Sequence, residues 1–395
     1  MSSPVAGVAD DVLRIAVLGP MAFVSGENQW AGAVLARDEI NGEGGISIHG
    51  KRLKIELIRV DTNEMLSVLD ATSAMERAIT RDKADVLVGG FRSEAVLAMQ
   101  EIAMDHRKLF LGCGASDAKL GAKVEESYER YKYWFRNCTL SSAALTQTLY
   151  RVLDDIGARI HRNLNKERLR VAIVAEKATW TEAVTRSALV TLPKMKMDVV
   201  GVWRPSPFAA DLTPELAAID RAGIDLVLTA LSGPVGVVLA RQMGERHMKP
   251  IAFGINVEAQ KDEFWQATAG KGNYATTLDT YAEVELTPAT IPFVRAFKAR
   301  FGKMPTYTAA TYDVIKGLRA AIEKAATTDA DKIVATIEKM TFVASGGIGE
   351  YDRAHDLVWG IGKSTGIAVQ WQGGKRVPFW PPGVKGMQQF QLPSR

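Results

Sequence analysis

The sequence predicts an α/β fold with two Rossmann-like lobes, each built around a mostly parallel sheet. Short apolar runs alternate with longer helical patterns, which is the signature of parallel βαβ units. This alternation runs through residues 13–111 and restarts at residue 168, so two blocks of similar size follow one another. At 395 residues the chain is also longer than one average domain.

The first block holds apolar runs that end at glycines or turns. We expect strands at residues 13–17, 54–60, 84–88 and 109–111. The helices between them are expected at residues 27–40, 66–81 and 93–106. In the first helix, Trp30, Ala33, Ala36 and Ile40 recur at spacings of three and four, which places them on one face.

The second block follows an extended connector at residues 133–137 and a helix that Ser141 or Ser142 caps and that runs to about residue 156. Its strands are expected at residues 168–174, 199–203, 225–229 and 251–253, and its helices at residues 179–192, 211–222 and 234–246. The chain then becomes helical at residues 288–301, 308–325 and 328–340, and a Gly-rich turn at 346–349 precedes alternating residues 366–371 that indicate a hairpin. Helices that return after two blocks mean that the chain crosses between the lobes more than once.

Composition excludes several classes of protein. With 47% hydrophobic and 24% charged residues the chain is not disordered. Its 49 Lys and Arg against 45 Asp and Glu are spread thinly, so we expect no nucleic-acid partner. No run approaches the roughly 20 apolar residues of a membrane-spanning helix. The N-terminal MSSPVAGVADD lacks the features of a secretory signal, so the protein is either cytoplasmic or a mature form whose leader has been removed.

Ligands of open α/β sheets bind beyond the carboxyl ends of the strands, where helix N-termini offer unpaired amides. The corresponding segments are residues 19–26, which include Ser25, and residues 89–93, 112–116, 176–180, 229–233 and 254–256. If two lobes face each other across these ends, the site lies between them.

Several segments, in order, resemble the type I periplasmic binding proteins, in particular the leucine/isoleucine/valine-binding branch of branched-chain amino acid ABC transporters. The matching segments are 14–20, 36–46, 60–62, 86–93, 109–116, 133–136 and 310–313. The resemblance implies a two-lobed flytrap whose hinge has three crossovers, at residues 137–140, 277–282 and 342–349. The lobes would be residues 1–137 plus 282–344 and residues 138–281 plus 345–395.

The resemblance also implies site residues. The positions that hold a ligand carboxylate match Ser93, Gly114 and Ser116, and the neighbouring Ala115 belongs to the same segment. Two hydroxyls with helix-start amides can cradle a carboxylate without a full positive charge. The aromatic residue that covers the ligand matches Trp180, and Ser232 occupies a further position of the second lobe. The alternatives are helix capping by the two serines and plain packing by Trp180.

One position departs from the family pattern. Amino-acid-binding members commonly place an acidic residue opposite the ligand ammonium, where this chain has Asn256, and an amide cannot neutralise a buried cation. The sequence does not place the possible substitutes Glu176, Glu258 and Asp279 in the cleft. We therefore expect a carboxylate with an apolar or aromatic body packed on Trp180 and Phe91. Arg92 is either a bidentate carboxylate contact or a solvated helix start.

No enzymatic motif emerges. The five histidines are scattered without metal-ligand spacing, so we expect no metal, cofactor or catalytic residue. Residues 362–365 resemble the end of a phosphate loop, but Leu357 stands where its first glycine should be. Cys113 and Cys138 would pair in an oxidising compartment, although two separate buried thiols are the simpler interpretation.

These observations predict a monomeric, periplasmic solute-binding protein that delivers a small organic ligand to an ABC permease in the membrane. The alternative is a cytoplasmic sensor of the same fold, like the amide-responsive regulators. A third hypothesis, from another class, is an α/β hydrolase or ligase.

Overall fold

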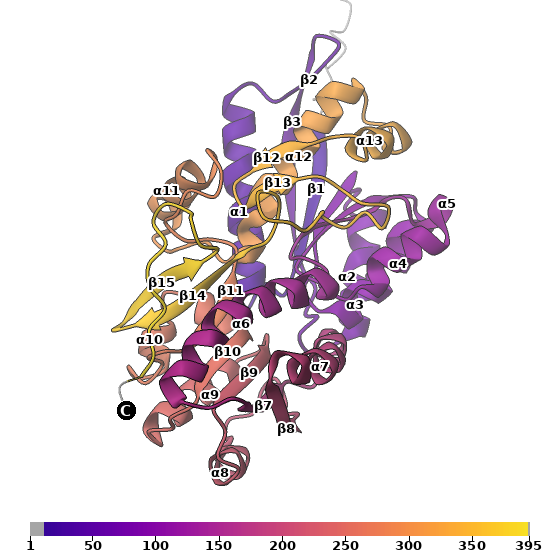
Figure 1. Cartoon of the computed structure of the whole chain (residues 1–395). Coiled ribbons are helices and arrows are strands. Elements are labelled where there is room, and N and C mark those ends of the chain that lie inside the picture. The colour runs from indigo at the N-terminus through magenta and orange to yellow at the C-terminus, as the bar shows by residue number, and fades with distance from the viewer. Residues whose placement is uncertain (1–11, 394–395) are drawn as a thin grey trace, which may run out of the picture.

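A computed structural model describes residues 12–393. It has the predicted α/β architecture of two lobes, each with its own sheet (Figure 1). Residues 1–11, on which the question of a leader depends, lie outside the described part. In Figure 1 the first lobe, indigo to purple, lies above the second, and the orange helices α12 and α13 return to the first.

The first sheet has six strands in the order β2-β3-β1-β4-β5-β6. Its strands are Val12–Gly19 (β1), Ile46–Ile48 (β2), Lys51–Asp61 (β3), Val86–Gly89 (β4), Leu109–Cys113 (β5) and Trp134–Cys138 (β6). All neighbours are parallel except β2 and β3, which form a hairpin. The order β3-β1-β4-β5-β6 is that of a doubly wound sheet, in which ligands bind where the winding reverses, here between β1 and β4.

The second sheet repeats this winding in the order β8-β7-β9-β10-β11 and adds an antiparallel hairpin, β14 and β15, at one edge. Its strands are Leu169–Ala175 (β7), Met197–Trp203 (β8), Leu226–Leu231 (β9), Ile251–Asn256 (β10), Thr276–Asp279 (β11), Ile367–Gln372 (β14) and Lys375–Trp380 (β15). A separate small hairpin joins Phe342–Ala344 (β12) and Gly347–Gly349 (β13). The second reversal of winding lies between β7 and β9.

Helices connect the parallel strands and cover the sheets. The helices of the first half are Val24–Gly42 (α1), Val68–Thr80 (α2), Ser93–Asp105 (α3), Lys119–Glu126 (α4), Tyr128–Tyr131 (α5), Ser142–Leu164 (α6) and Thr179–Thr191 (α7). Those of the second half are Thr213–Arg221 (α8), Val235–Glu245 (α9), Phe264–Ala267 (α10), Thr290–Phe301 (α11), Thr311–Ala325 (α12) and Ala330–Ile337 (α13), with short 3-10 turns at Leu192–Met195 (η1), Val257–Gln260 (η2) and Tyr307–Ala310 (η3). No helix within residues 12–393 is both long and apolar enough to cross a membrane.

The two hydrophobic cores show how the chain crosses between lobes. The core of the first sheet includes apolar side chains of α11, α12 and α13, whereas that of the second takes residues from β14, β15 and the C-terminal segment, including Phe390. This packing supports a division into residues 1–137 plus 282–344 and residues 138–281 plus 345–395, which remains a proposal.

The structure changes two sequence-based expectations. The connector at residues 133–137 is strand β6, which pairs in parallel with β5 and buries Trp134, Phe135 and Arg136. Its apolar run is too short to stand out from the sequence. The helix that follows begins as predicted, with the Ser141 hydroxyl accepting from the amide of Ala144, but it continues to Leu164 because Ile160 extends its buried face.

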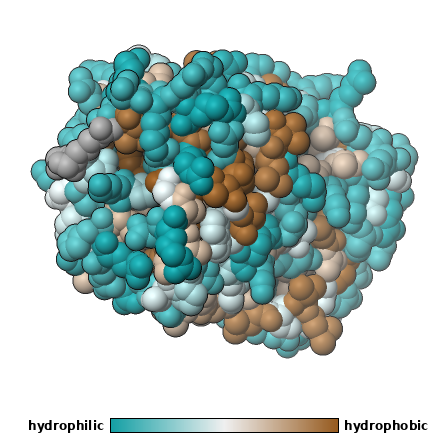
Figure 2. All heavy atoms as spheres, turned by 60° about the horizontal axis from the view of Figure 1, so that its bottom comes forward, coloured by the Kyte–Doolittle hydropathy of each residue, from teal (hydrophilic) through white to brown (hydrophobic). Residues whose placement is uncertain are grey.

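Apolar side chains remain exposed on the second lobe. They include Leu189 and Val190 on α7 and Val200 and Val202 on the edge strand β8. These elements lie at the bottom of Figure 1, and Figure 2 turns that side toward the reader, where hydrophobic patches interrupt a mostly hydrophilic surface.

Cys113 and Cys138 end the neighbouring strands β5 and β6 and form a disulfide, with their Cα atoms 4.4 Å apart. The simpler expectation of two separate thiols was therefore wrong. The strand pairing aligns Cys113 with Cys138, a register that the sequence alone did not reveal.

The disulfide should stabilise the fold. It closes a loop of 25 residues, and loop-closure entropy predicts that the double variant Cys113→Ser, Cys138→Ser loses about 3.5 kcal/mol of unfolding free energy. Urea unfolding with and without reductant measures this loss. Reductant should lower the wild-type midpoint and leave the double variant unchanged; a wild-type midpoint that is insensitive to reductant would contradict the assignment.

Candidate functional site

A cavity of ≈ 120 Å³ lies between the lobes, where the carboxyl ends of both sets of parallel strands face each other. An apolar cavity of about 150 Å³ accepts a benzene ring, so this space suits a ligand of about one ring or a short chain. Its first-lobe wall includes Phe91, Ser93 and Ser116. Its second-lobe wall includes Trp180 and Leu278.

The hydroxyl of Ser93 is held at the start of α3. Its Oγ accepts from the amide of Asp117 at 3.2 Å, which leaves its own proton free to be donated. Ser116 lies in the loop after β5, and Gly114 brings that loop close to the one after β4. A Cβ at Gly114 would lie 2.4 Å from the Gly90 carbonyl oxygen, and its φ of +151° also favours glycine. Two hydroxyl donors therefore belong to adjacent loops of the first lobe.

Arg136 is fully buried on β6 and holds in place the loop after β5, which carries Ser116. Its guanidinium donates to the carbonyl of Ala115 and, at 2.7 Å, to that of Asp117. The Asp356 carboxylate balances its charge at 2.6 Å. Because Ser116 lies between the two clamped carbonyls, Arg136 is a positioning residue for this hydroxyl.

Trp180 lies in the first turn of α7 and is 7% exposed. It belongs both to the core of the second lobe and to the cavity wall. The Trp180 side chain can therefore both pack in the core of the second lobe and cover a bound ligand. Ile255 and Leu278, at the ends of neighbouring strands, continue the apolar surface.

An ion pair crosses between the lobes beside the cavity. Arg92, just before α3, lies 3.0 Å from Glu176, which follows β7. Arg92 also pairs with Glu94 at 2.7 Å within its own lobe. Glu176 is fully buried and accepts from the amides of Ser232 and Gly233, both at 2.8 Å. Arg92 is 6% exposed and is not a solvated helix start; its charge is already balanced, so a bidentate contact with a ligand remains only a prediction.

Glu64 supports the same loop from below. Its carboxylate accepts from the amides of Phe91 and Arg92, both at 2.9 Å, and from the hydroxyl of Thr62 at 2.8 Å. Burial nevertheless raises the pKa of Glu64 from 4.5 to about 6. This carboxyl occupies the amides of Phe91 and Arg92, just before α3, so these two groups are not free to donate to a ligand.

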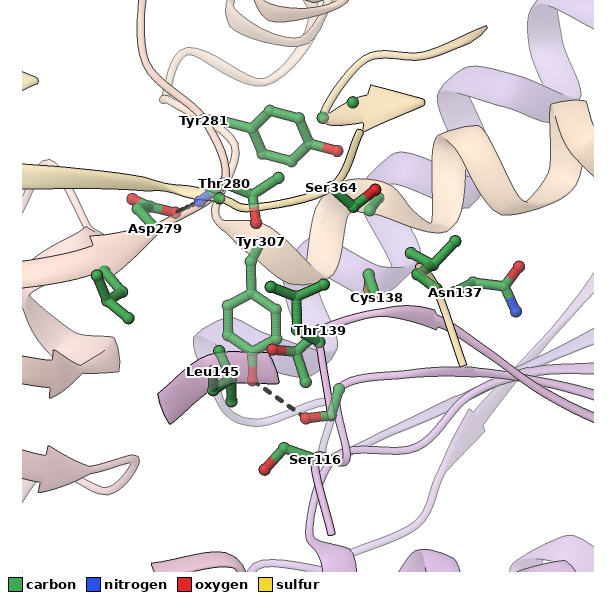
Figure 3. A pocket seen from close by; sticks show the side chains of 18 of the residues that line it. Ser116, Asn137, Cys138, Thr139, Leu145, Asp279, Thr280, Tyr281, Tyr307 and Ser364 are labelled. Carbon is green, nitrogen blue, oxygen red and sulfur yellow. Dashed lines mark hydrogen bonds between the residues drawn. The ribbon is translucent and has the colours of Figure 1, made fainter. Parts of the chain in front are cut away.

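The hinge side of the cavity carries residues that the sequence analysis did not single out. Tyr307, in η3, packs near Phe91 and donates from its hydroxyl to the Gly114 carbonyl at 3.4 Å (Figure 3). Asp313 accepts from the amide of Ser345 at 2.9 Å and from the hydroxyls of Ser345 and Tyr281. Burial raises the pKa values of Tyr307, Tyr281 and Asp313.

Asp279 is the one proposed ammonium partner that lines the cavity. It ends β11, accepts from the amide of Thr280 at 2.7 Å and forms an ion pair with Arg376. Burial raises its pKa from 3.8 to about 6. Glu258 instead pairs with Lys261 at 2.6 Å. The rule that ligands bind beyond strand ends would have found Asp279 if it had been applied to this strand.

The sequence-based site residues divide into two sets. Those that line the cavity are Phe91, Arg92, Ser93, Gly114, Ser116, Trp180 and Ser232. Ser25, Ala115 and Asn256 are not among the lining residues of the described chain. The backbone carbonyls of Ser25 and Ala115 accept bonds from Thr308 and Arg136, and the Asn256 amide donates to the Gly236 carbonyl at 3.1 Å. Ligand contact by any of these residues remains a prediction.

Comparison with known proteins agrees with this architecture. A family model described as periplasmic binding protein matches residues 14–375. Leu/Ile/Val-binding protein homolog 7 of Brucella abortus is 22% identical over 389 residues, covering 95% of this chain and 92% of that relative. The leucine-binding protein LivK of Thermotoga maritima has a TM-score of 0.76 at 20% identity, with 93% and 97% of the two chains covered. An ABC transporter solute-binding protein of R. palustris in complex with benzoate has a TM-score of 0.75 at 19% identity, with 95% and 99% covered.

The ion pair between Arg92 and Glu176 should favour the closed arrangement of the lobes. Glu176→Gln removes the charge that attracts Arg92 across the cleft, and breaking a buried pair costs roughly 3–5 kcal/mol at most. We expect small-angle scattering of the ligand-free variant to give a larger radius of gyration than the wild type. The matched control is Glu94→Gln, which removes a partner of Arg92 within one lobe and should leave the radius unchanged. Equal radii for all three proteins would contradict the role of the pair.

The raised pKa of Glu64 predicts a pH dependence of stability. Because the folded-state pKa of about 6 lies above the unfolded value of 4.5, the folded protein holds this proton more tightly. The contribution of this proton to the free energy of unfolding is full below pH 4.5. It falls by about 2 kcal/mol as the pH rises through 6. Glu64→Gln lacks this fall, so urea unfolding should show the variant gaining about 2 kcal/mol relative to the wild type between about pH 4 and about pH 7. A constant difference between the two proteins would contradict the raised pKa.

Proposed function

Because the chain belongs to the periplasmic binding protein family, in its branched-chain amino acid branch, we propose that it is the solute-binding protein of an ABC importer and takes up a small carboxylate. Proteins of this family bind solutes rather than catalyse reactions. The observation that carries the proposal is a cavity between two lobes, with two serine hydroxyls on one wall and an indole on the other.

The acidic side chains near the cavity already have partners, which favours a ligand that has a carboxylate but no ammonium group. Asp279 is paired with Arg376, and Glu176 is paired with Arg92. Asp313 already accepts three hydrogen bonds. A ligand ammonium would have to displace one of these partners, whereas a carboxylate needs only the hydroxyl protons of Ser93 and Ser116.

Binding would act by a population shift. A ligand that contacts Ser93 of the first lobe and Trp180 of the second makes both sets of contacts only when the lobes are closed, so its binding free energy favours the closed state. The closed form would then be recognised by a membrane permease. The disulfide between Cys113 and Cys138 supports an oxidising compartment such as the periplasm and disfavours the cytoplasmic-sensor alternative.

The leucine-binding and benzoate-bound structural relatives represent the two ligand chemistries that must be separated. Isothermal titration with benzoate, hexanoate and leucine should rank both plain carboxylates above leucine. The double variant Ser93→Ala, Ser116→Ala should weaken carboxylate binding by about ten- to hundredfold while keeping its melting temperature within a few degrees. Ser142→Ala, a buried serine at the start of α6 that does not line the cavity, is the matched control and should bind like the wild type. Tighter binding of leucine would show that the ammonium partner has been misassigned.

A further inference from the structure

The side chain of Tyr307 crosses the cavity between the lobes. Tyr307 lies in η3, is 9% exposed and lines the cavity. In Figure 3 its ring extends from η3 to the loop after β5, with Asp279 on one side of the ring and Cys138 on the other. Both of these residues also line the cavity. The phenol ring therefore separates the part of the cavity beside the second lobe from the part beside the first crossover.

The backbone of Tyr307 is fixed by buried hydrogen bonds that join its surroundings to α1. The hydroxyl of Thr308 donates to the Ser25 carbonyl at 2.9 Å. The hydroxyl of Thr311 donates to the Gln29 carbonyl at 2.7 Å. Both threonines are fully buried. The turn that carries Tyr307 therefore cannot move without breaking buried hydrogen bonds, which costs free energy.

The far end of the Tyr307 side chain is held as well. Its hydroxyl donates to the Gly114 carbonyl at 3.4 Å. Its ring packs near Phe91, with the two ring centroids 6.5 Å apart. Because protein interiors are close-packed, a buried ring that is held at both ends does not swing aside easily. A ligand must therefore fit beside this ring rather than displace it.

The fixed ring limits the space for the body of a ligand. The cavity has a volume of ≈ 120 Å³, and a cavity of about 150 Å³ accepts one benzene ring. The lining also includes Asn137, Gly347 and Ser364 on the hinge side, so the cavity continues past the Tyr307 ring. A second ring joined to the first would need the space that Tyr307 fills.

We propose that Tyr307 is a specificity residue that limits the ligand to an acid with one ring or a short chain and excludes acids with two joined rings. This inference rests on the proposed function, since it names the size class of acid that the same cavity takes. A site rejects an oversized ligand through overlap with a side chain that cannot move away. Removal of the phenol ring should therefore admit the second ring.

The test compares ligands of two sizes by isothermal titration. Benzoate has one ring, and biphenyl-3-carboxylate and biphenyl-4-carboxylate add a second ring in two directions. We expect the wild type to bind benzoate at least about tenfold more tightly than either biphenyl acid. In Tyr307→Ala this preference should disappear or reverse for the better biphenyl acid, because the space left by a phenol ring can bury a phenyl ring.

Two control variants show whether the ring of Tyr307 is responsible. Tyr307→Phe keeps the ring and should keep the preference for benzoate. Tyr312→Ala deletes the same kind of ring from a residue that is 8% exposed but does not line the cavity, and it should also keep the preference. A biphenyl acid that binds the wild type as tightly as benzoate, or that Tyr307→Ala still excludes, would overturn the role of Tyr307.

Loss of a buried ring also destabilises the fold, so melting temperatures provide a second measurement. A biphenyl acid should raise the melting temperature of Tyr307→Ala more than benzoate does, because a ligand that binds the folded form stabilises it. In the wild type the order should be reversed. Tyr307→Leu also removes the ring but keeps more apolar contact, and it takes the place of Tyr307→Ala if that variant does not fold.

The outcomes separate this inference from the proposed function. Phenylalanine and biphenylalanine form a second pair of sizes that carries an ammonium group. If only these amino acids bind, and biphenylalanine binds only Tyr307→Ala, the carboxylate proposal fails and the role of Tyr307 stands. If the carboxylates bind without any effect of Tyr307→Ala on the size preference, the role of Tyr307 is overturned and the carboxylate proposal stands. If none of these ligands binds any of the proteins, both are overturned.

Discussion

A guanidinium and a carboxylate meet in a buried position between the two lobes, and the arrangement of the site depends on this contact. Arg92 comes from the loop after β4 and Glu176 from the loop after β7, so their 3.0 Å contact joins the two strand-end surfaces. Both groups keep further partners in their own lobes, Glu94 for Arg92 and the amides of Ser232 and Gly233 for Glu176. Burying either charge without the other would cost free energy. Formation of the ion pair is therefore coupled to closure of the cavity.

The acidic side chains at the cavity already have partners, and this limits which ligands the cavity can recognise. Asp279 has Arg376 as its partner, and Asp313 has Ser345 and Tyr281. Hydrogen-bonding groups still available to a ligand include the hydroxyl protons of the two cavity serines. A ligand with an acid at one end and an apolar body complements these groups without disturbing an existing ion pair.

Sequence reasoning predicted the fold because hydrophobic periodicity is local, and the repeated βα pattern produced two sheets with the same strand order. It also predicted that Ser93, Ser116 and Trp180 lie at one cavity, since each comes within five residues of the carboxyl end of a parallel strand. The partners of these residues could not be predicted. Arg92 and Glu176 are 84 positions apart, and Arg136 reaches Asp356 across 220. Such pairings depend on how two sheets face each other, which no local pattern encodes. Asn256 illustrates the same limit, since it ends β10 but does not line the cavity: a strand-end position does not determine where the side chain points.

The central claim is that a ligand carboxylate is held by uncharged donors on the first lobe while Arg92 remains committed to acidic side chains. A crystal structure of the protein with a bound aromatic carboxylate tests this most directly. The account predicts carboxylate oxygens within hydrogen-bond distance of the Ser93 and Ser116 hydroxyls, the ring against Trp180, and the contact between Arg92 and Glu176 intact. A carboxylate bound by the Arg92 guanidinium, with Glu176 displaced, would contradict it.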